Sequence, residues 1–415
     1  MEWTSLATLA PTALSTLLYT FVQGTYVGTL WRAPRVGPAP VRPWVSILKP
    51  IAGLDDELLE NLRSFADLDY PAYELLLGVA SLHEPAVPRL RAFLAAHPAL
   101  QARLIVTAEP SSECPNPKVA QLRVLTCAAR GSVLVVSDAN VRVPRDYLHG
   151  LMGALLRPGT GLVSSLVVGR GERTLGASLD HAHLGAFIAP LVVFASRVLG
   201  HTVTIGKSMA MRKTDLERVG GWESVSHVLA EDELLGRRFH AHGYHVELVL
   251  SPVENHARSG SVGRTVERHA RWTRMRKSIE PRAYALEWLL SPALIAAVTL
   301  AIVPSTLALG MLAATLLFQV LGAALALSVT RKGAFGLALL EPLRLAMGTA
   351  SWALGGVSRR VSWRGREYVV GAGSVLRPRA ARRGLVVANG QAALRGGGDL
   401  GEDRVDSERA VERRE

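Results

Sequence analysis

The chain has 415 residues, of which 49% are hydrophobic and 20% are charged, and its formal net charge is +12. The charged share lies below the ~25% of an average soluble domain, and the apolar content is too high for an intrinsically disordered chain. The excess of positive charge favours anionic partners such as phosphorylated small molecules or anionic lipid. Two cysteines, Cys114 and Cys127, are too few for a disulfide framework or a four-cysteine zinc site.

Two long stretches of the sequence, residues 3–31 and 288–330, carry no charged side chain. A helix that crosses the hydrocarbon core of a bilayer needs about 20 mostly apolar residues. We therefore expect a membrane protein with a retained span at 5–31 and two later spans at 288–303 and 306–329. This composition disfavours a purely soluble nucleic-acid-binding protein, and no nucleic-acid partner is expected.

The residues after the first uncharged stretch indicate its orientation. A Pro-rich linker at 34–43 is accompanied by Arg32, Arg35, Arg42 and Lys49. Basic residues that flank a span mark its cytoplasmic side. We expect a multi-pass protein of the cell membrane whose polar middle part lies in the cytoplasm.

The C-terminal part divides into three segments by composition. We assign 286–357 to C-terminal membrane helices, of which 335–357 is interfacial or re-entrant because it contains a proline and two charged residues. Residues 358–375 are expected to form a short basic β pair. Residues 376–415 are rich in Arg, Gly, Glu and Asp, which predicts a disordered tail.

An α/β domain is expected between these membrane segments, over residues 44–275. Short apolar runs alternate there with helical patterns, and Asp55 or Asp56 is placed to cap the first helix. The predicted strands are 45–48, 75–79, 104–106 and 133–136. This alternation predicts a mostly parallel sheet with helices on both faces. Ligands bind at the carboxyl ends of such strands, so residues 137–140 are the first candidate site.

Asp138 and Asn140 directly follow the last of these strands. Side chains at positions i and i+2 near a strand point the same way. Two oxygen ligands there suit a hard divalent cation that holds a diphosphate. Asp and Asn are equally common in a simple strand-end turn, so the spacing alone leaves both interpretations open.

A second acidic group, Glu231, Asp232 and Glu233, stands at the start of a predicted helix. Acidic residues at this position often serve only as helix caps and partners of the helix dipole. The functional alternative is that one of them is a general base, which must then lie within hydrogen-bond reach of a substrate hydroxyl.

A basic helix is predicted at 262–282, directly before the later spans. Arg264, Arg268 and Arg271 fall on one stripe of this helix, and Trp272 follows. The stripe could contact anionic lipid headgroups. Alternatively, an arginine could bind a phosphate through two hydrogen bonds while the indole packs on a ring.

The tripeptide Gly206-Lys207-Ser208 is similar to the end of a phosphate-binding loop. The preceding glycine, Gly200, is one residue too far away for that loop. We therefore do not expect a nucleoside triphosphatase, and interpret the tripeptide as a strand break that lines the site.

Together, six ordered motifs resemble the ceramide glucosyltransferase family, which belongs with the inverting GT-A glycosyltransferases and includes bacterial relatives that glycosylate hopanoids. The resemblance covers roughly residues 45–290. The motifs are LKPIAGLD (48–55), ENLRSF (60–65), NPKV (116–119), SDANVRV (137–143), ED (231–232) and RHARW (268–272).

The resemblance implies a Rossmann-like GT-A domain and a role for each matching residue. Asp232 would be the catalytic base, and Asp138 would lie at the metal and the donor diphosphate, with Asn140 as a second metal ligand for Mg²⁺ or Mn²⁺. The remaining implied donor-binding residues are Lys49, Lys118, Arg268, Arg271 and Trp272. Glu231, Gly206 and Trp272 would lie on the acceptor side.

Two positions depart from the family pattern. Relatives usually carry an aspartate soon after the Gly78-Val79 strand, where this chain has Ser81 and Glu84. Many relatives also have a second aspartate where this chain has Asn140. A neutral amide is a weaker cation ligand than a carboxylate, so the departures bear on nucleotide choice and on the metal.

The resemblance predicts a membrane-bound enzyme that moves a hexose, glucose or N-acetylglucosamine, from a UDP-sugar to a lipid hydroxyl, with ceramide as the first expectation. A hopanoid or a diacylglycerol would also satisfy the motifs. The alternatives are a processive polysaccharide synthase, which would need more spans, and a non-catalytic membrane protein that binds nucleotide or lipid. An anionic-lipid scaffold would account for the charge of +12 but not for the ordered acidic motifs.

Overall fold

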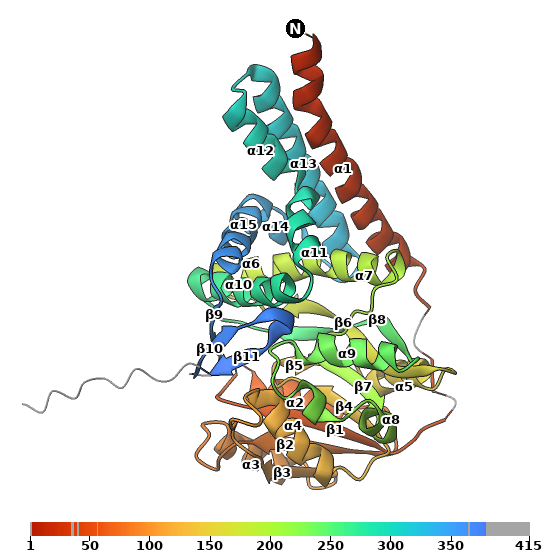
Figure 1. Cartoon of the computed structure of the whole chain (residues 1–415). Helices are drawn as coiled ribbons and strands as arrows, with labels where there is room; N and C mark the ends of the chain where they lie inside the picture. The colour runs from red at the N-terminus through yellow and green to blue at the C-terminus, as the bar shows by residue number, and fades with distance from the viewer. Residues whose placement is uncertain (1, 35–36, 40, 56, 364–365, 379–415) are drawn as a thin grey trace, which may run out of the picture. The chain divides into compact units, whose positions relative to one another are not determined.

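The computed structural model describes residues 2–34, 37–39, 41–55, 57–363 and 366–378 (Figure 1). Its centre is an eight-stranded sheet with the strand order β3-β2-β1-β4-β7-β6-β8-β5. The strands are β1 Val45–Ile51, β2 Tyr73–Val79, β3 Ala102–Val106, β4 Val133–Ser137, β5 Val141–Arg142, β6 Thr160–Arg170, β7 Ser208–Arg212 and β8 His245–His256.

Helices cover both faces of this sheet because successive residues of a buried strand point to opposite sides. Ile47 packs in one apolar core and its neighbour Leu48 packs in the other. The first core includes α2 Leu58–Ala66, α3 Val87–Ala96 and α5 Tyr147–Leu155. The second includes α4 Pro117–Ala128, α8 Lys213–Arg218, the short helix η2 Trp222–Val225 and α9 Glu231–Ala241. The predicted α/β fold with helices on both faces is confirmed.

The sheet is more mixed than the sequence predicted. The strands β3, β2, β1 and β4 are parallel, as expected. Strand β7 runs antiparallel to both β4 and β6, and β5 runs antiparallel to β8. Strands β6 and β8 are parallel, so this half of the sheet is mixed rather than mostly parallel as predicted. Between β6 and β7 the chain leaves the sheet through a long helical segment, which returns it in the opposite direction.

The start of α2 also differs from the expectation. Its N-cap residue is Glu57, which has a left-handed backbone and makes no side-chain cap. The Glu57 carboxylate instead forms ion pairs with Arg142 and Arg258. The N-cap position is therefore not the predicted Asp55, and Asp56 lies outside the described residues.

Helices α1, α12 and α13 extend side by side away from the sheet (Figure 1). They comprise α1 Glu2–Trp31, α12 Pro292–Ile302 and α13 Thr306–Ser328. Between them and the sheet lies a layer of α6 Leu175–His183, η1 Leu184–Ile188, α7 Ala189–Arg197, α10 Val262–Ile279, α11 Pro281–Leu286, η3 Glu287–Leu290, α14 Phe335–Ala338 and α15 Glu341–Val357.

Two described helical segments are long and apolar enough to cross a membrane, or three if a bent pair counts as one span. These segments are 175–197, 306–328 and the pair 281–290 with 292–302, which is bent by 78°. The expected span at 306–329 is matched by α13. The expected span at 5–31 forms one helix, α1, but α1 is not among the described segments that are apolar enough to cross a membrane. The expected span at 288–303 is only partly helical, because α12 starts at Pro292 after the bend. The segment 175–197 was not predicted as a span, because it lies inside the α/β domain.

A small antiparallel sheet follows the helices, with the order β11-β10-β9. Its strands are β9 Arg360–Trp363, β10 Arg366–Val370 and β11 Leu376–Pro378, and the short helix η4 Ala372–Ser374 precedes β11. The first two strands match the expected basic β pair. The third lies at the start of the range expected as a tail, and the tail from residue 379 onward lies outside the described residues.

Candidate functional site

Asp138 lies just beyond the carboxyl end of β4, at the edge where the sequence placed the first candidate site. Its carboxylate contacts Lys118 at 3.0 Å and Lys207 at 3.5 Å. Its backbone carbonyl accepts a hydrogen bond of 2.8 Å from the ammonium of Lys49, which is buried beneath it on β1. Burial lowers the pKa of Lys49 to about 7. Asp138 thus lies among three lysines that come from three different parts of the chain.

Lys118 stands in the first turn of α4, whose start is defined by Asn116. The Asn116 side chain accepts hydrogen bonds from the backbone amides of Lys118 and Val119, a normal N-cap arrangement. The Lys118 ammonium contacts Asp138, Glu231 at 3.2 Å, and the carbonyl of Gly206 at 2.8 Å. Burial works against its charge, but the nearby carboxylates raise its pKa above the ordinary value. Lys118 therefore remains a cation that joins both acidic motifs.

Asp232 lies at the N-terminus of α9, and two backbone amides hold its carboxylate. Gly206 donates to one oxygen at 2.6 Å, and Glu233 donates to the other at 2.9 Å. Burial and the charge of Glu231 raise the pKa of Asp232 to about 7. A carboxylate whose pKa lies near the working pH can accept a proton and release it again, as a general base requires.

Glu231 is also buried, but its carboxylate is already engaged. One oxygen contacts Lys118, and the other accepts a hydrogen bond of 3.3 Å from Asn116. These partners hold Glu231 as part of the support around Lys118. Its predicted acceptor-side role stays a prediction.

Gly206 and Lys207 form the turn before β7 and bring the two acidic motifs together. A side chain at Gly206 would place a Cβ atom 2.8 Å from the Asp232 carboxylate and 2.9 Å from the Lys118 ammonium. A larger residue here would therefore force one of these two side chains to shift. Lys207 was not predicted as a site residue. Its position in the Gly-Lys-Ser tripeptide was the available signal.

Lys207 also bears on the question of a metal. Its ammonium contacts Asn140 at 2.9 Å as well as Asp138, so a cation already stands between these two oxygen ligands. Among the residues with described positions, no group of three or more His, Cys, Asp or Glu side chains could hold a metal ion. One carboxylate and one amide oxygen nevertheless fit a Mg²⁺-type ion whose remaining ligands come from phosphates and water.

Helix α10 carries the RHARW motif, residues 268–272, which we call the basic box. This helix belongs to the layer between the sheet and the apolar helices (Figure 1). Arg268 forms an ion pair with Asp180 of α6 and stacks over Trp272, whose ring lies 5.5 Å away. Burial lowers the pKa of Lys207, Asp138 opposes this shift, and Arg268 adds a smaller lowering effect. The positive charge of Arg268 therefore acts on Lys207. Arg271 lies on the same helix and is half-buried.

The two positions that depart from the family pattern have local partners. The Glu84 carboxylate accepts a hydrogen bond of 2.9 Å from the backbone amide of Gly53, in the loop that follows β1. The Ser81 hydroxyl accepts one of 3.1 Å from the amide of His83. Both side chains stabilise loops at the carboxyl edge of the parallel strands.

The small C-terminal sheet braces the loop that precedes Asp232. Ser374 is fully buried and has a left-handed backbone with φ of 66°. Its hydroxyl accepts a hydrogen bond of 3.0 Å from the amide of Ala230, and its carbonyl accepts one of 2.8 Å from Leu229. The position of Asp232 thus depends on a segment far along the chain.

The sequence matches the family model described as glycosyl transferase family 21 over residues 8–376. The chain belongs to this family. The match extends over the α/β domain, the membrane-length helices and the start of β11, and it confirms the resemblance drawn from the six motifs.

Several curated relatives of this family 21 chain are ceramide glucosyltransferases. Ceramide glucosyltransferase 1 of Caenorhabditis elegans is 26% identical over 254 residues, which cover 61% of this chain and 54% of that protein. The Pyricularia oryzae enzyme is 25% identical over 327 residues, 64% of this chain and 65% of that protein. The Komagataella phaffii enzyme is 34% identical over 123 residues, 28% of this chain and 24% of that protein. The chain spans about half the length of the first of these relatives.

Solved glycosyltransferase structures are also similar. The mannosyltransferase PcManGT from Pyrobaculum calidifontis, in complex with GDP-Man and Mn²⁺, has a TM-score of 0.46 and 20% identity over 84% of this chain and 98% of that chain. Residues 1–349 of TarS from S. aureus, in complex with UDP-GlcNAc, have a TM-score of 0.37 and 11% identity over 79% of this chain and 96% of that chain.

Proposed function

We propose that this family 21 protein is an inverting glycosyltransferase that transfers one hexose, glucose or N-acetylglucosamine, from a UDP-sugar to a lipid hydroxyl, with ceramide as the first candidate acceptor. The observation that carries the proposal is the convergence of Asp138 and Asp232. Lys118 contacts Asp138 and the carbonyl of Gly206, while the amide of Gly206 holds Asp232. Such an arrangement can hold the donor diphosphate near Asp138 and place Asp232 as the base at the same reaction centre.

Asp232 is proposed to accept the proton of the lipid hydroxyl as its oxygen attacks the anomeric carbon. The bond between this carbon and the diphosphate oxygen breaks in the same displacement, so the configuration inverts. Two backbone amides orient the carboxylate before the substrate arrives. This preorganisation lowers the cost of placing the base correctly in the transition state.

The leaving diphosphate requires positive charge, and the site supplies it around Asp138. Lys118 and Lys207 are both buried or nearly so, and each can lie close to a phosphate oxygen. A divalent cation held by Asp138 and Asn140 would supply further charge neutralisation when bound. Preorganised charge of this kind is often the largest contribution to catalysis, with single donors worth ~10²–10³ in rate.

A lipid acceptor accounts for the order of elements in the chain. Helix α10 carries the basic box, and the apolar helices α12 and α13 follow it. A lipid can then keep its chains in the bilayer while its head reaches the α/β domain. We propose a multi-pass protein of the cell membrane with the catalytic domain in the cytoplasm, where UDP-sugars are available.

The direct test uses the purified full chain in detergent or nanodiscs with UDP-glucose or UDP-N-acetylglucosamine. Ceramide, a hopanoid and a diacylglycerol are offered as separate acceptors, with and without Mg²⁺ or Mn²⁺. UDP release and the mass of the lipid product are measured together. A product with one added hexose supports the proposal. A long polymer would indicate a polysaccharide synthase, and UDP binding without release would indicate a non-catalytic protein.

A further inference from the structure

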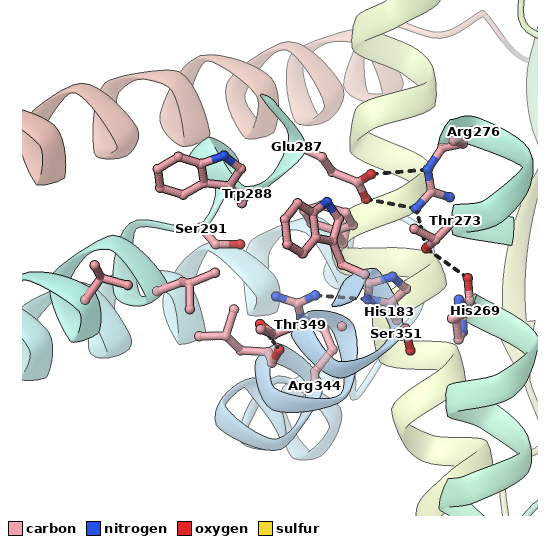
Figure 2. A pocket seen from close by; sticks show the side chains of 16 residues that line it. His183, His269, Thr273, Arg276, Glu287, Trp288, Ser291, Arg344, Thr349 and Ser351 are labelled. Carbon is pink, nitrogen blue, oxygen red and sulfur yellow. Dashed lines mark hydrogen bonds and ion pairs between the residues drawn. The ribbon is translucent and has the colours of Figure 1, made fainter. Parts of the chain in front are cut away.

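A cavity of about 330 Å³ lies in the layer of helices between the sheet and the apolar helices α12 and α13, and its lining includes neither Asp138 nor Asp232 (Figure 2). It is lined by side chains of α6, α10, η3, α12 and α15, together with Phe187 of η1 and Ser291. Helix α12 lies within the uncharged stretch 288–330, and α10 and α15 lie before and after it. The cavity therefore joins the apolar helices to the helix that carries the basic box.

One end of the cavity is polar and contains His183, His269 and Arg344 (Figure 2). Arg344 approaches His183 Nδ1 at 3.0 Å, and because a guanidinium only donates, this nitrogen must accept. The proton of His183 is then on Nε2. His269 Nε2 lies 2.8 Å from the carboxylate of Asp180, which only accepts, so Nε2 carries the proton and a neutral ring has an acceptor at Nδ1.

His183 Nε2 therefore carries a proton and can donate a hydrogen bond, whereas His269 Nδ1 carries none and can accept one. Within the described part of the chain, no hydrogen bond reaches His183 Nε2 or His269 Nδ1. Burial lowers the pKa of His269, which favours its neutral form. The two rings pack edge to face with their centroids 4.6 Å apart. The polar end therefore offers one donor and one acceptor side by side, the pattern that a hydroxyl or an amide group satisfies.

The charges around the cavity are balanced. Arg276 makes two hydrogen bonds to Glu287, at 2.9 and 3.2 Å. Arg344 makes two to Glu341, at 2.6 and 2.7 Å. No cation with a described position lines the cavity without a carboxylate partner. A phosphate or carboxylate head would have to break one of these pairs, whereas an uncharged head would not.

The other end of the cavity is apolar and open. Leu294 and Val298 of α12 line it together with Trp288, and Val298 is 46% and Trp288 39% exposed. An exposed apolar rim of this kind is expected where a cavity opens toward lipid chains rather than water.

The polar end also adjoins the basic box. His269 and Arg268 bind the same carboxylate, Asp180. The ring of His269 packs on that of Trp272 with the centroids 4.9 Å apart. A molecule whose head lies at His183 and His269 is therefore next to the helix that faces Lys207 and Asp138.

We propose that this cavity binds the acceptor lipid through an uncharged head that carries hydroxyl or amide groups, and that the lipid enters from the bilayer past Val298. This inference rests on the proposed transfer to a lipid and narrows its acceptor to neutral lipids. The cavity is too small for a whole two-chain lipid, so it takes the head and the first carbons, and the chains remain between the apolar helices.

The test compares Val298→Trp, which fills the mouth of the cavity, with Ile302→Trp on the same helix but outside the lining. A ceramide with a diazirine on its chain is photo-crosslinked to the full chain in nanodiscs without any sugar donor, and labelled peptides are identified by mass spectrometry. We expect labelling of α12 or α15 that Val298→Trp reduces about tenfold and Ile302→Trp leaves unchanged. Unlabelled ceramide should compete, and phosphatidic acid should not.

Kinetics separate this proposal from the proposed function. Val298→Trp should raise the KM for ceramide about tenfold while the KM for the UDP-sugar stays unchanged. Equal labelling of Val298→Trp and the wild type would overturn the cavity assignment, and stronger competition by phosphatidic acid would overturn the neutral head. Specific labelling without any sugar transfer would leave the lipid site standing and contradict the proposed function instead. Melting temperatures equal to the wild type show that both variants fold.

Discussion

The ammonium of Lys118 lies 3.0 Å from the carboxylate of Asp138, although Lys118 belongs to the first turn of α4 and Asp138 follows the strand β4. The same ammonium contacts Glu231, the neighbour of Asp232. One buried cation therefore joins the two acidic motifs, which each have an ordinary local explanation when considered alone.

Replacing Asp232 by Asn should remove sugar transfer. The amide keeps the size of the carboxylate but cannot accept the proton, and general bases contribute about 10²–10⁴-fold in rate. We expect kcat for the lipid product to fall at least ~10²-fold with an unchanged melting temperature. Glu233→Gln is the matched control, because the Glu233 carboxylate is paired with Arg237 and only its backbone amide, which Gln keeps, contacts Asp232. Full turnover in Asp232→Asn would reject Asp232 as the base.

The pH dependence follows from the raised pKa of Asp232, which is about 7. Because the base must be a carboxylate, kcat/KM should rise with pH to a midpoint near 7, and should fall about tenfold per pH unit well below it. Between the ordinary carboxyl pKa and 7 the folded protein binds more protons at this group than the unfolded chain does. The group therefore contributes stability at low pH that is lost as the pH rises through 7. Melting curves of the wild type and Asp232→Asn across pH 4–8 check this sign.

Lys118→Met should destabilise the protein as well as inactivate it. The change leaves the carboxylates of Asp138 and Glu231 without their shared cation, and breaking a buried ion pair costs about 3–5 kcal/mol. Denaturant unfolding measures the loss. In the double variant with Glu231→Gln, part of the stability should return because one uncompensated charge is gone. Independent, additive effects of the two substitutions would argue against the shared cation.

Gly206→Ala should impair catalysis by moving Asp232 and Lys118. The added Cβ would lie 2.8 and 2.9 Å from their side-chain atoms, so one or both must shift. A misplacement of about 1 Å can cost ~10²-fold in rate. Gly153→Ala is the control, because nothing lies within 4 Å of its added Cβ in α5. The control should keep full activity and gain up to about 1 kcal/mol of helix stability. Wild-type kcat in Gly206→Ala would contradict the tight approach.

Ser374 offers a test of the brace from the C-terminal sheet. Ser374→Ala removes the acceptor for the Ala230 amide and leaves a left-handed backbone without its hydroxyl. An unsatisfied buried amide costs about 1–3 kcal/mol, so both stability and kcat should fall. Ser374→Gly loses the same hydrogen bond but tolerates the positive φ, and should be the less damaged variant by ~1 kcal/mol. Equal stability of both variants would show that the backbone conformation does not matter here.

The sequence by itself determined the parts of this protein that depend on neighbouring residues. Apolar runs such as 133–136 predicted the strands of the parallel half. The length of the uncharged stretch 288–330 predicted the apolar helix α13, and the six motifs identified the family. Asp138 lies beyond a buried strand, as predicted, because the spacing of apolar residues and the residues that end a strand are local properties of the sequence.

Only the tertiary structure decided which distant residues face each other. It reversed β7 in the sheet, brought Lys207 to Asp138, paired Arg268 with Asp180, and closed a cavity around His183. None of these follows from a local pattern, because an ion pair or a cavity wall is formed by segments that the chain separates widely. The same side chains would be plain surface charges or helix caps if the sheet and the helix layer were packed in another register.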